Sequence, residues 1–232
     1  MGKRTGADER DDGKRVQKKP KVTRHLLNKD GSAWVDQFQL PPDMRMSSEE
    51  FNQLWREHPE HKGTVELFGK DIETPRWFQS YGKPYAFSGK EHEAKPVPPL
   101  VQRYLDYANE QEQYLEPYAK QEGRFNMALL NWYEDGSHYI GYHSDDESSM
   151  LRCKGASIVY SVSFGGKRRF LMKPKKNTKH HRGTLELELR DNCVVVMGGL
   201  CQQLYKHSVP KITGAKAKLT PPRINLTARM FV

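Results

Sequence analysis

The chain has 232 residues, of which 38 are Lys or Arg and 29 are Asp or Glu, so its formal net charge is +9. Apolar residues make up 36% of the chain, which suffices for one core and argues against wholesale disorder. The longest apolar run, Cys193–Met197, is far shorter than the ~18 residues of a membrane helix. The charges at the N-terminus are not followed by an apolar stretch, so the sequence indicates no secretory signal. The three cysteines form no CxxC pair, which argues against a disulfide framework or a structural zinc site.

The first 30 residues hold ten Lys or Arg and five Asp or Glu, and therefore +5 of the net charge. Their few apolar side chains cannot offset the entropy of ordering, so we expect disorder there and assign residues 1–45 to a basic tail. Three basic groups in this tail are typical of a nuclear-localisation patch or a nucleic-acid-binding arm, with a solvated tail as the alternative: Lys3-Arg4, Lys14-Arg15 and Lys18-Lys19-Pro20-Lys21.

Two helices are predicted after the tail. Ser47 and Glu50 have the spacing of a capping box, and Phe51, Leu54 and Trp55 follow at helical spacing. A second helix is expected to begin at Pro98-Pro99, with one apolar side: Leu100, Val101, Tyr104, Leu105 and Ala108.

From residue 125 onward, apolar residues recur with a period of two, which is typical of β-strands. We predict strands over residues 127–133, 158–164, 185–189, 193–197 and 224–230, and an exposed loop over Lys173–Arg182. Several short strands with Gly and Pro between them indicate an α+β, mainly β fold, with an antiparallel sandwich or jelly roll.

A His-x-Asp pair, His143 and Asp145, is the first candidate for chemistry. Side chains two apart on an extended chain point the same way, with Cα atoms about 6–7 Å apart. With one distant histidine, such a pair makes the 2-His-1-carboxylate set of non-haem Fe(II) oxygenases. One His-x-Asp pair is close to chance expectation among nine histidines, so a histidine in a surface turn is the alternative.

The last predicted strand places polar residues on one face and apolar residues on the other. The polar face carries Arg223, Asn225, Thr227 and Arg229, and the apolar face carries Ile224, Leu226, Ala228 and Met230. Two inward arginines are costly unless each meets an anion, and a dicarboxylate could supply both anions. A solvent-exposed polar face of an edge strand is the alternative.

Asn131 and Tyr133 share one face of the strand before the His-x-Asp pair. Amide and phenol groups are suitable donors to a carboxylate beside an arginine. Ordinary sandwich alternation explains the same pattern.

Together these segments resemble the AlkB-type Fe(II)/2-oxoglutarate dioxygenases, in the right order and at the right spacings over residues 64–231. Leu67–Lys70 is similar to a finger hairpin found in that family. The other matching motifs are Pro75-Arg76, Tyr81-Gly82 and Tyr85–Gly89 of a substrate lid, then Asn131–Glu147, Leu204–Lys211 and Pro222–Arg229.

The resemblance implies a double-stranded β-helix (jelly-roll) core with flanking helices and an N-terminal nucleotide-recognition lid. The domain would span residues 46–232, with helices, finger and lid in 46–125 and the catalytic jelly roll in 126–232. Fe(II), 2-oxoglutarate and O2 would be required. By the same resemblance, His143, Asp145 and His207 would be the catalytic metal ligands.

The resemblance also assigns residues to the co-substrate 2-oxoglutarate. Arg223 and Tyr133 would hold its distal carboxylate. Arg229 and Asn131 would hold the end that chelates iron, with two further residues of the last strand alongside: Asn225 and Thr227.

For the substrate, the resemblance implies a flipped, alkylated nucleobase. Phe87 would stack on the base beside Tyr85, and Asp146 and Glu147 would lie at the cationic lesion. Phe68, with Gly69 and Lys70, would form a wedge that fills the gap in the duplex. Several basic residues could contact phosphates, with general surface basicity as the alternative: Arg76, Lys70, Lys167, Arg168 and Arg169.

The function implied is oxidative demethylation of 1-methyladenine and 3-methylcytosine in alkylated DNA. It is direct-reversal repair in which 2-oxoglutarate becomes succinate and CO2 and formaldehyde is released. The alternatives are the same chemistry on methylated RNA and an inactive nucleic-acid-binding module. We expect single- or double-stranded DNA as the partner, no membrane, a monomer, and a nuclear or otherwise cytoplasmic location.

Overall fold

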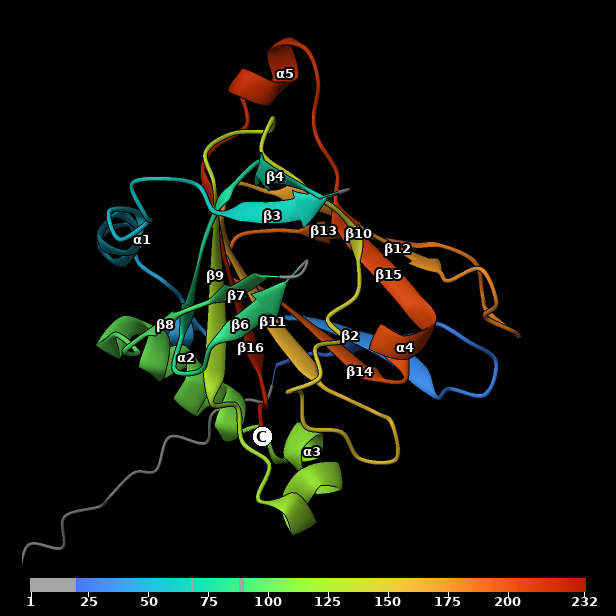
Figure 1. Ribbon diagram of the computed structural model, residues 1–232. Coiled ribbons are helices and arrows are strands. Elements are labelled where there is room, and N and C mark those ends of the chain that lie inside the picture. The colour runs from blue at the N-terminus through green and yellow to red at the C-terminus, as the bar shows by residue number, and fades with distance from the viewer. Residues whose placement is uncertain (1–19, 68, 88–89) are drawn as a thin grey trace, which may run out of the picture.

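The computed structural model describes residues 20–67, 69–87 and 90–232, without the side chains of Leu67 and Phe87. A large and a small β-sheet face each other, and helices cover the outer face of the large sheet (Figure 1). The large sheet has eight strands in the order β1 (Thr23–Leu26), β2 (Ala33–Gln39), β14 (Cys193–Gly199), β11 (Val159–Gly165), β16 (Arg223–Arg229), β9 (Met127–Tyr133), β5 (Trp77–Tyr81) and β8 (Ala94–Lys95).

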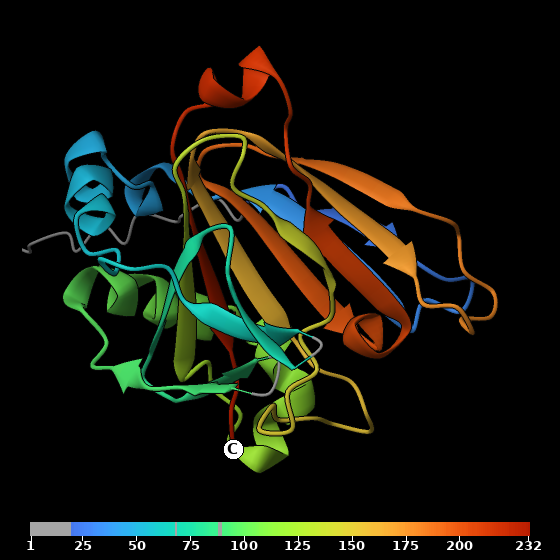
Figure 2. The same cartoon turned by 45° about the horizontal axis from the view of Figure 1, so that its top comes forward.

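The small sheet and two hairpins complete the β structure. All pairs in the small sheet are antiparallel. Figure 2 shows the two hairpins on the same side of the opening between the sheets. The small sheet has the order β10 (Ile140–His143), β15 (Tyr205–Val209), β12 (Arg168–Pro174) and β13 (Leu185–Leu189), and the hairpins are β3 (Thr64–Leu67) with β4 (Lys70–Glu73) and β6 (Tyr85–Phe87) with β7 (Lys90–His92).

From β9 onward the chain alternates between the two sheets, except that β12 and β13 follow each other in the small sheet. β9, β11, β14 and β16 lie in the large sheet, and β10, β12, β13 and β15 lie in the small one. This connectivity confirms the predicted jelly roll. The strands predicted from period-two alternation at 127–133, 158–164, 185–189, 193–197 and 224–230 all form, to within a residue or two.

The helices form where the capping and apolar signals predict them. In α1 (Ser48–Trp55), Ser47 Oγ accepts from Glu50 N, and Ser47 N donates to the Glu50 carboxylate, so the capping box is present. α2 (Pro99–Asn109) has Pro99 in its first turn and buries the predicted apolar side against the large sheet. The remaining short helices are the 3-10 helices η1 (Pro42–Met44) and η2 (Glu116–Gln121) and the α-helices α3 (Glu112–Leu115), α4 (Cys201–Leu204) and α5 (Ala215–Lys218).

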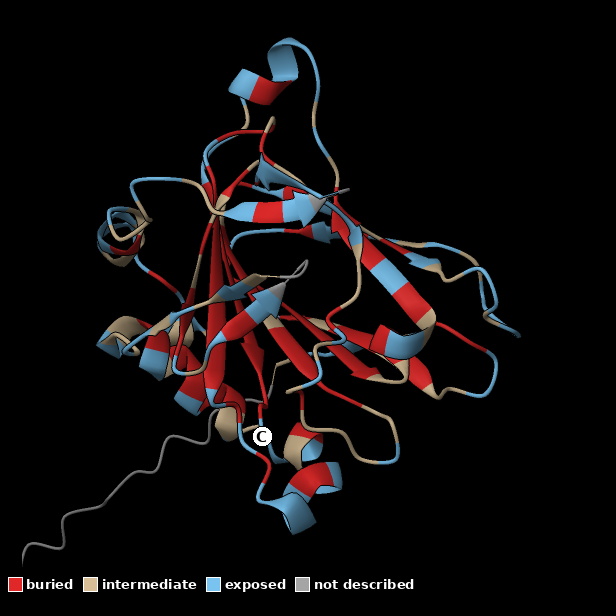
Figure 3. Ribbon diagram, viewed as in Figure 1, coloured by how far each residue is buried: buried red, intermediate tan, exposed pale blue. Residues whose placement is uncertain are grey.

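The large sheet separates two apolar clusters. The even-numbered residues 224–230 lie in the cluster under the helices, and the opposite face of β16 points into the space between the sheets. Both faces of the large sheet are therefore buried, whereas the outward face of the small sheet is largely exposed (Figure 3). The prediction that Arg223, Asn225, Thr227 and Arg229 face inward is confirmed, because all four are buried.

The tail assigned to residues 1–45 is wrong over its second half. β1 and β2 lie within it and extend the large sheet beyond β14. Asp36 of β2 is buried, and both its oxygens accept from Arg24 of β1 at 2.7 Å. Low apolar content predicted disorder in the first 30 residues, and the boundary at residue 45 included β2 as well. The Arg24–Asp36 ion pair and three buried side chains of β2 anchor both strands: Ala33, Val35 and Phe38. Residues 1–19 lie outside the described part of the chain.

In the part of the chain that the structure describes, no helix is long and apolar enough to cross a membrane.

Candidate metal centre and co-substrate pocket

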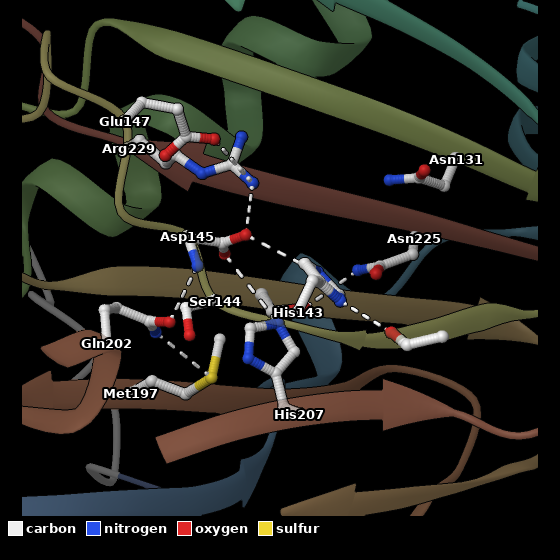
Figure 4. Close-up of polar contacts among 12 residues, drawn as sticks. Asn131, His143, Ser144, Asp145, Glu147, Met197, Gln202, His207, Asn225 and Arg229 are labelled. Atoms are coloured by element: carbon white, nitrogen blue, oxygen red, sulfur yellow. Dashed lines mark hydrogen bonds and ion pairs between the residues drawn. The ribbon is translucent and has the colours of Figure 1, made fainter. Parts of the chain in front are cut away.

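Strand register brings the predicted metal ligands together. His143 at the end of β10 pairs directly with His207 of β15, and Asp145 follows two residues after His143. One ligand atom from each of the three residues can be chosen so that all lie within 4.8 Å of one another (Figure 4). The Asp145 oxygens lie 3.6 Å from His143 Nε2 and 3.9 Å from His207 Nε2.

The electrostatics of this cluster leave all three residues ready to bind a cation. Burial lowers the pKa of both histidines, that of His207 to about 3, so their rings are neutral at pH 7. Burial alone would raise the pKa of Asp145, but the guanidinium of Arg229 and the two histidines hold it well below its usual range. Two neutral imidazoles and one carboxylate are the donor set that the sequence suggested.

A backbone carbonyl orients the first ligand. His143 Nδ1 lies 2.9 Å from the carbonyl oxygen of Gly141, so a proton on Nδ1 makes Nε2 the unprotonated nitrogen, which can coordinate a metal.

Arg229 joins the metal cluster to a second carboxyl group. Its Nη2 lies 3.0 Å from Asp145 Oδ1 and 4.0 Å from Glu147 Oε1. Burial raises the pKa of Glu147, and its Oε2 is buried with no hydrogen-bond partner among the described residues. Asp146 lies outside this cluster, because its side chain is exposed and contacts Lys175 at 3.5 Å.

One pocket lies beside the metal cluster and is lined by both sheets and the lid. The small sheet contributes His143 and His207, and the large sheet contributes the polar residues predicted to bind an acid. Tyr85 of β6 closes the pocket from the lid side, and its ring lies 5.2 Å from the Arg229 guanidinium carbon. The predicted residues that line the pocket are Arg76, Tyr85, Asn131, Tyr133, His143, Asp145, His207, Asn225, Thr227 and Arg229.

Arg223 is a fully buried cation beside this pocket. Its Nη2 donates to Ser163 Oγ at 2.8 Å, and its guanidinium carbon lies 4.8 Å from the ring centre of Tyr133. Its Nε and Nη1 are buried without a hydrogen-bond partner among the described residues. Such donors are expensive to bury unsatisfied, so this position calls for an anion.

The other predicted acid-binding residues are already partly engaged. Asn225 Nδ2 donates to Ser161 Oγ and to the Val162 carbonyl. Asn131 Oδ1 accepts from Arg76 Nε at 2.6 Å, which leaves the Asn131 amide nitrogen facing the pocket (Figure 4).

Two arginines assigned to phosphate contacts are buried instead. Arg76 is 4% exposed and binds Asn131, so it is a wall of the pocket. Arg168 is 2% exposed and donates to backbone carbonyls of the β9–β10 loop, that of His138 at 2.8 Å among them, and to the carbonyl of Pro210 after β15 at 2.8 Å. The sequence did not reveal this difference, because Lys167, Arg168 and Arg169 are all basic. Only the alternation of buried and exposed side chains along β12 distinguishes Arg168 from its exposed neighbours.

The neighbours of Arg168 are exposed and paired with carboxylates. Lys167 lies 3.4 Å from Glu188, and Arg169 lies 2.6 Å from Glu186 across the β12–β13 ladder. Their phosphate-binding role stays a prediction, since exposed pairs of this kind exchange partners easily.

The finger and the lid form as hairpins. Leu67 pairs with Lys70 across the β3–β4 turn, and Gly69 takes a φ of +72°, which favours glycine there. The predicted wedge Phe68 lies outside the described residues, and so does the side chain of Phe87.

Metal positions open to other ligands, beside a cleft built to accept a small acid, characterise the non-haem iron dioxygenases that consume 2-oxoglutarate. The profile of the 2OG-Fe(II) oxygenase superfamily matches residues 33–229, and the chain belongs to this superfamily. Its cofactors are therefore Fe(II), 2-oxoglutarate and O2, and it is an enzyme.

The chain is similar to curated members of the AlkB branch. It is 30% identical over 175 residues to DNA oxidative demethylase ALKBH2 of Homo sapiens, which covers 72% of this chain and 61% of that protein. The mouse ALKBH2 is 33% identical over 72% of this chain and 66% of its own length. Alpha-ketoglutarate-dependent dioxygenase alkB homolog 3 of Bos taurus is 29% identical over 81% of this chain and 62% of its own length. The matched region thus spans less than two thirds of each relative.

A solved structure, that of OsALKBH1, shares the fold. It superposes with a TM-score of 0.55 at 15% identity and covers 90% of this chain and 99% of its own.

The residues present fit both cofactors. The buried His143, Asp145 and His207 form an Fe(II) donor set, and the unsatisfied donors of Arg223 fit one carboxylate of 2-oxoglutarate.

Proposed function

We propose that this enzyme oxidatively demethylates N-alkylated bases in DNA. The observation that carries the proposal is the position of Tyr85, which a strand of the lid delivers into the same pocket as the metal cluster. An aromatic residue beside an iron site fits a planar base drawn out of its stack. The similarity to proteins named DNA oxidative demethylase supports this substrate class.

When bound, Fe(II) would activate O2 with two electrons from 2-oxoglutarate, which becomes succinate and CO2; one oxygen atom would enter succinate and the other would hydroxylate the methyl group, which leaves the base as formaldehyde. The chain contributes binding and orientation. His143, Asp145 and His207 hold the metal, while Arg223 and Tyr133 bind the distal carboxylate of the co-substrate. Arg229 keeps Asp145 ionised and lies over the ring of Tyr85, so it connects the metal side of the pocket to the base side.

Glu147 suits a cationic substrate such as 1-methyladenine or 3-methylcytosine. Its carboxyl is 9% exposed, its pKa is raised by burial, and one oxygen has no partner among the described residues. A positively charged base brought near this group favours the ionised carboxylate. Glu147→Gln should therefore slow demethylation of these cationic bases more than demethylation of a neutral alkylated base.

The test is a single-turnover assay with Fe(II), 2-oxoglutarate and ascorbate on matched single- and double-stranded oligonucleotides that carry one 1-methyladenine. Mass spectrometry follows the loss of about 14 Da, with His143→Ala as the control. Loss in the wild type alone supports the proposal. No loss in DNA, together with loss in a methylated RNA of the same sequence, would replace DNA by RNA.

The finger favours duplex DNA as the form of the substrate. We expect Phe68→Ala to impair repair of the duplex far more than repair of the single strand. Equal effects on the duplex and on the single-stranded substrate would contradict the role of Phe68 as a wedge. The basic N-terminal segment supports a nuclear location, which imaging of the full chain with and without residues 1–19 would test.

A further inference from the structure

Asp145 is the only one of the three metal ligands that lies outside the β-strands. β10 ends at His143, and His207 lies within β15, so the sheet fixes the backbone of both histidines. A carboxylate on a segment without a ladder needs another restraint if it is to stay aimed at the metal.

The side chain of Gln202 supplies that restraint. The backbone N–H of Asp145 donates to Gln202 Oε1 at 3.0 Å, so an amide replaces the missing strand partner. Gln202 comes from α4, 57 residues further along the chain, and is only 2% exposed. Figure 4 shows it on the side of Asp145 away from Arg229.

Gln202 is itself fixed in one orientation. Its Nε2 donates to Met197 Sδ at 3.4 Å, which sets the amide with its oxygen toward Asp145. Lys175 Nζ donates to the backbone carbonyl oxygen of Gln202 at 2.9 Å, and this bond connects α4 to the residue that follows β12. A second tie holds the adjoining residue, since Ser144 Oγ donates to the carbonyl oxygen of Tyr205.

We infer that Gln202 is a positioning residue for the iron ligand Asp145. It touches neither metal nor substrate, and it acts by holding the backbone from which the carboxylate extends. Removing its oxygen leaves the buried Asp145 N–H without a partner, so the segment must shift to reach water or another acceptor. The inference rests on the metal site alone and is independent of which nucleic acid is the substrate.

The test compares Gln202→Leu with Gln203→Leu. Gln203 lies next in the same helix, is exposed, and donates to the Gly155 carbonyl, so its loss removes an amide that does not contact Asp145. Mn(II) affinity is measured from the electron paramagnetic resonance signal of free Mn(II), with 2-oxoglutarate present and no nucleic acid. Co(II) absorption spectra report the ligand geometry.

We expect Q202L to weaken Mn(II) binding about 10- to 100-fold and to alter the Co(II) spectrum, with Q203L like the wild type. A structural role alone would lower the melting temperature of the metal-free protein and leave both metal readouts unchanged. Unchanged Mn(II) affinity in Q202L overturns the inference. If Q202L does not fold, Q202N replaces it under the same criterion, because it keeps a buried amide and shortens its reach. Absence of demethylation by a wild-type enzyme that binds metal normally would count against the proposed substrate and not against Gln202.

Discussion

Replacing Arg223 by Met should stabilise the ligand-free enzyme while strongly weakening its affinity for 2-oxoglutarate. Arg223 is fully buried, and its Nε and Nη1 have no partner among the described residues. Each buried unsatisfied group costs about 1–3 kcal/mol, and the hydrogen bond from Nη2 to Ser163 Oγ returns about 1 kcal/mol. Met fills a similar volume without polar atoms, so we expect a net gain of about 1–5 kcal/mol, or roughly 2–20 °C in melting temperature.

The same two groups set the expected loss of binding. Two hydrogen bonds from a guanidinium to a carboxylate contribute about 1.5–3 kcal/mol each. At about 1.4 kcal/mol per factor of ten, R223M should bind 2-oxoglutarate roughly 10²- to 10⁴-fold more weakly. Thermal unfolding is followed with and without 2-oxoglutarate, in the presence of Mn(II).

Arg168→Met is the matched control. Arg168 lies on β12 with its guanidinium carbon 5.6 Å from the Tyr133 ring, and it is as buried as Arg223. Its two Nη atoms donate to backbone carbonyls, including those of His138 and Pro210, and Nε alone lacks a partner among the described residues, so R168M should lose about 2–5 kcal/mol of stability. A destabilised R223M, or one that still binds 2-oxoglutarate with wild-type affinity, would refute the assignment of its free donors to the co-substrate.

Three further changes test the fold around the site. Arg24→Met leaves the buried Asp36 with only Tyr114 as a side-chain donor, and urea unfolding should show a loss of about 1–3 kcal/mol; no loss would mean that β1 is dispensable. Ser47→Ala removes the helix cap of α1 and should cost about 1 kcal/mol in the same assay, whereas Ser48→Ala should be nearly neutral. The hydrogen bond from Lys218 lowers the pKa of Asp135 in the folded protein. The ionised carboxylate therefore stabilises the fold at pH values above its unfolded pKa of ~3.9, and this stabilisation is lost as the pH falls through the lower pKa of the folded state. The stability difference between the wild type and Lys218→Met should therefore be present at pH 7 and vanish in strong acid; a difference independent of pH would contradict it.

The sequence predicted the central strands because their two faces carry different chemistry. On β16, apolar residues pack under the helices and polar residues face the opposite sheet, and this alternation is visible in the sequence. The His143-x-Asp145 pair is local in the same way. His207 is different, because among nine histidines only the pairing of β15 with β10 identifies it, and local spacing contains no such information.

The residues that sequence reasoning missed act through backbone atoms or buried pairs. Gln202 contacts the main chain of Asp145, and Arg168 contacts carbonyl groups, so no pattern of side-chain types marks either role. β1 was missed because composition predicts disorder where charge is dense, and β2, whose one charged residue is Asp36, was missed because the tail was extended to residue 45. Arg24 and Asp36 show that two opposite charges on facing strands can instead hold those strands together.

The charges at this site make stability depend on ligands. Arg229 has Asp145 as its partner, so the ion pair holds the carboxylate in place before a metal arrives. Arg223 has no carboxylate partner among the described residues. Its unsatisfied donors lower the stability of the ligand-free fold and are available to bind 2-oxoglutarate. 2-Oxoglutarate should therefore raise the melting temperature of the wild type by more than that of R223M. In the wild type it satisfies a group that the fold alone leaves unpaired. A stabilisation by 2-oxoglutarate that is equal in the wild type and R223M would show that the cation is matched by other means.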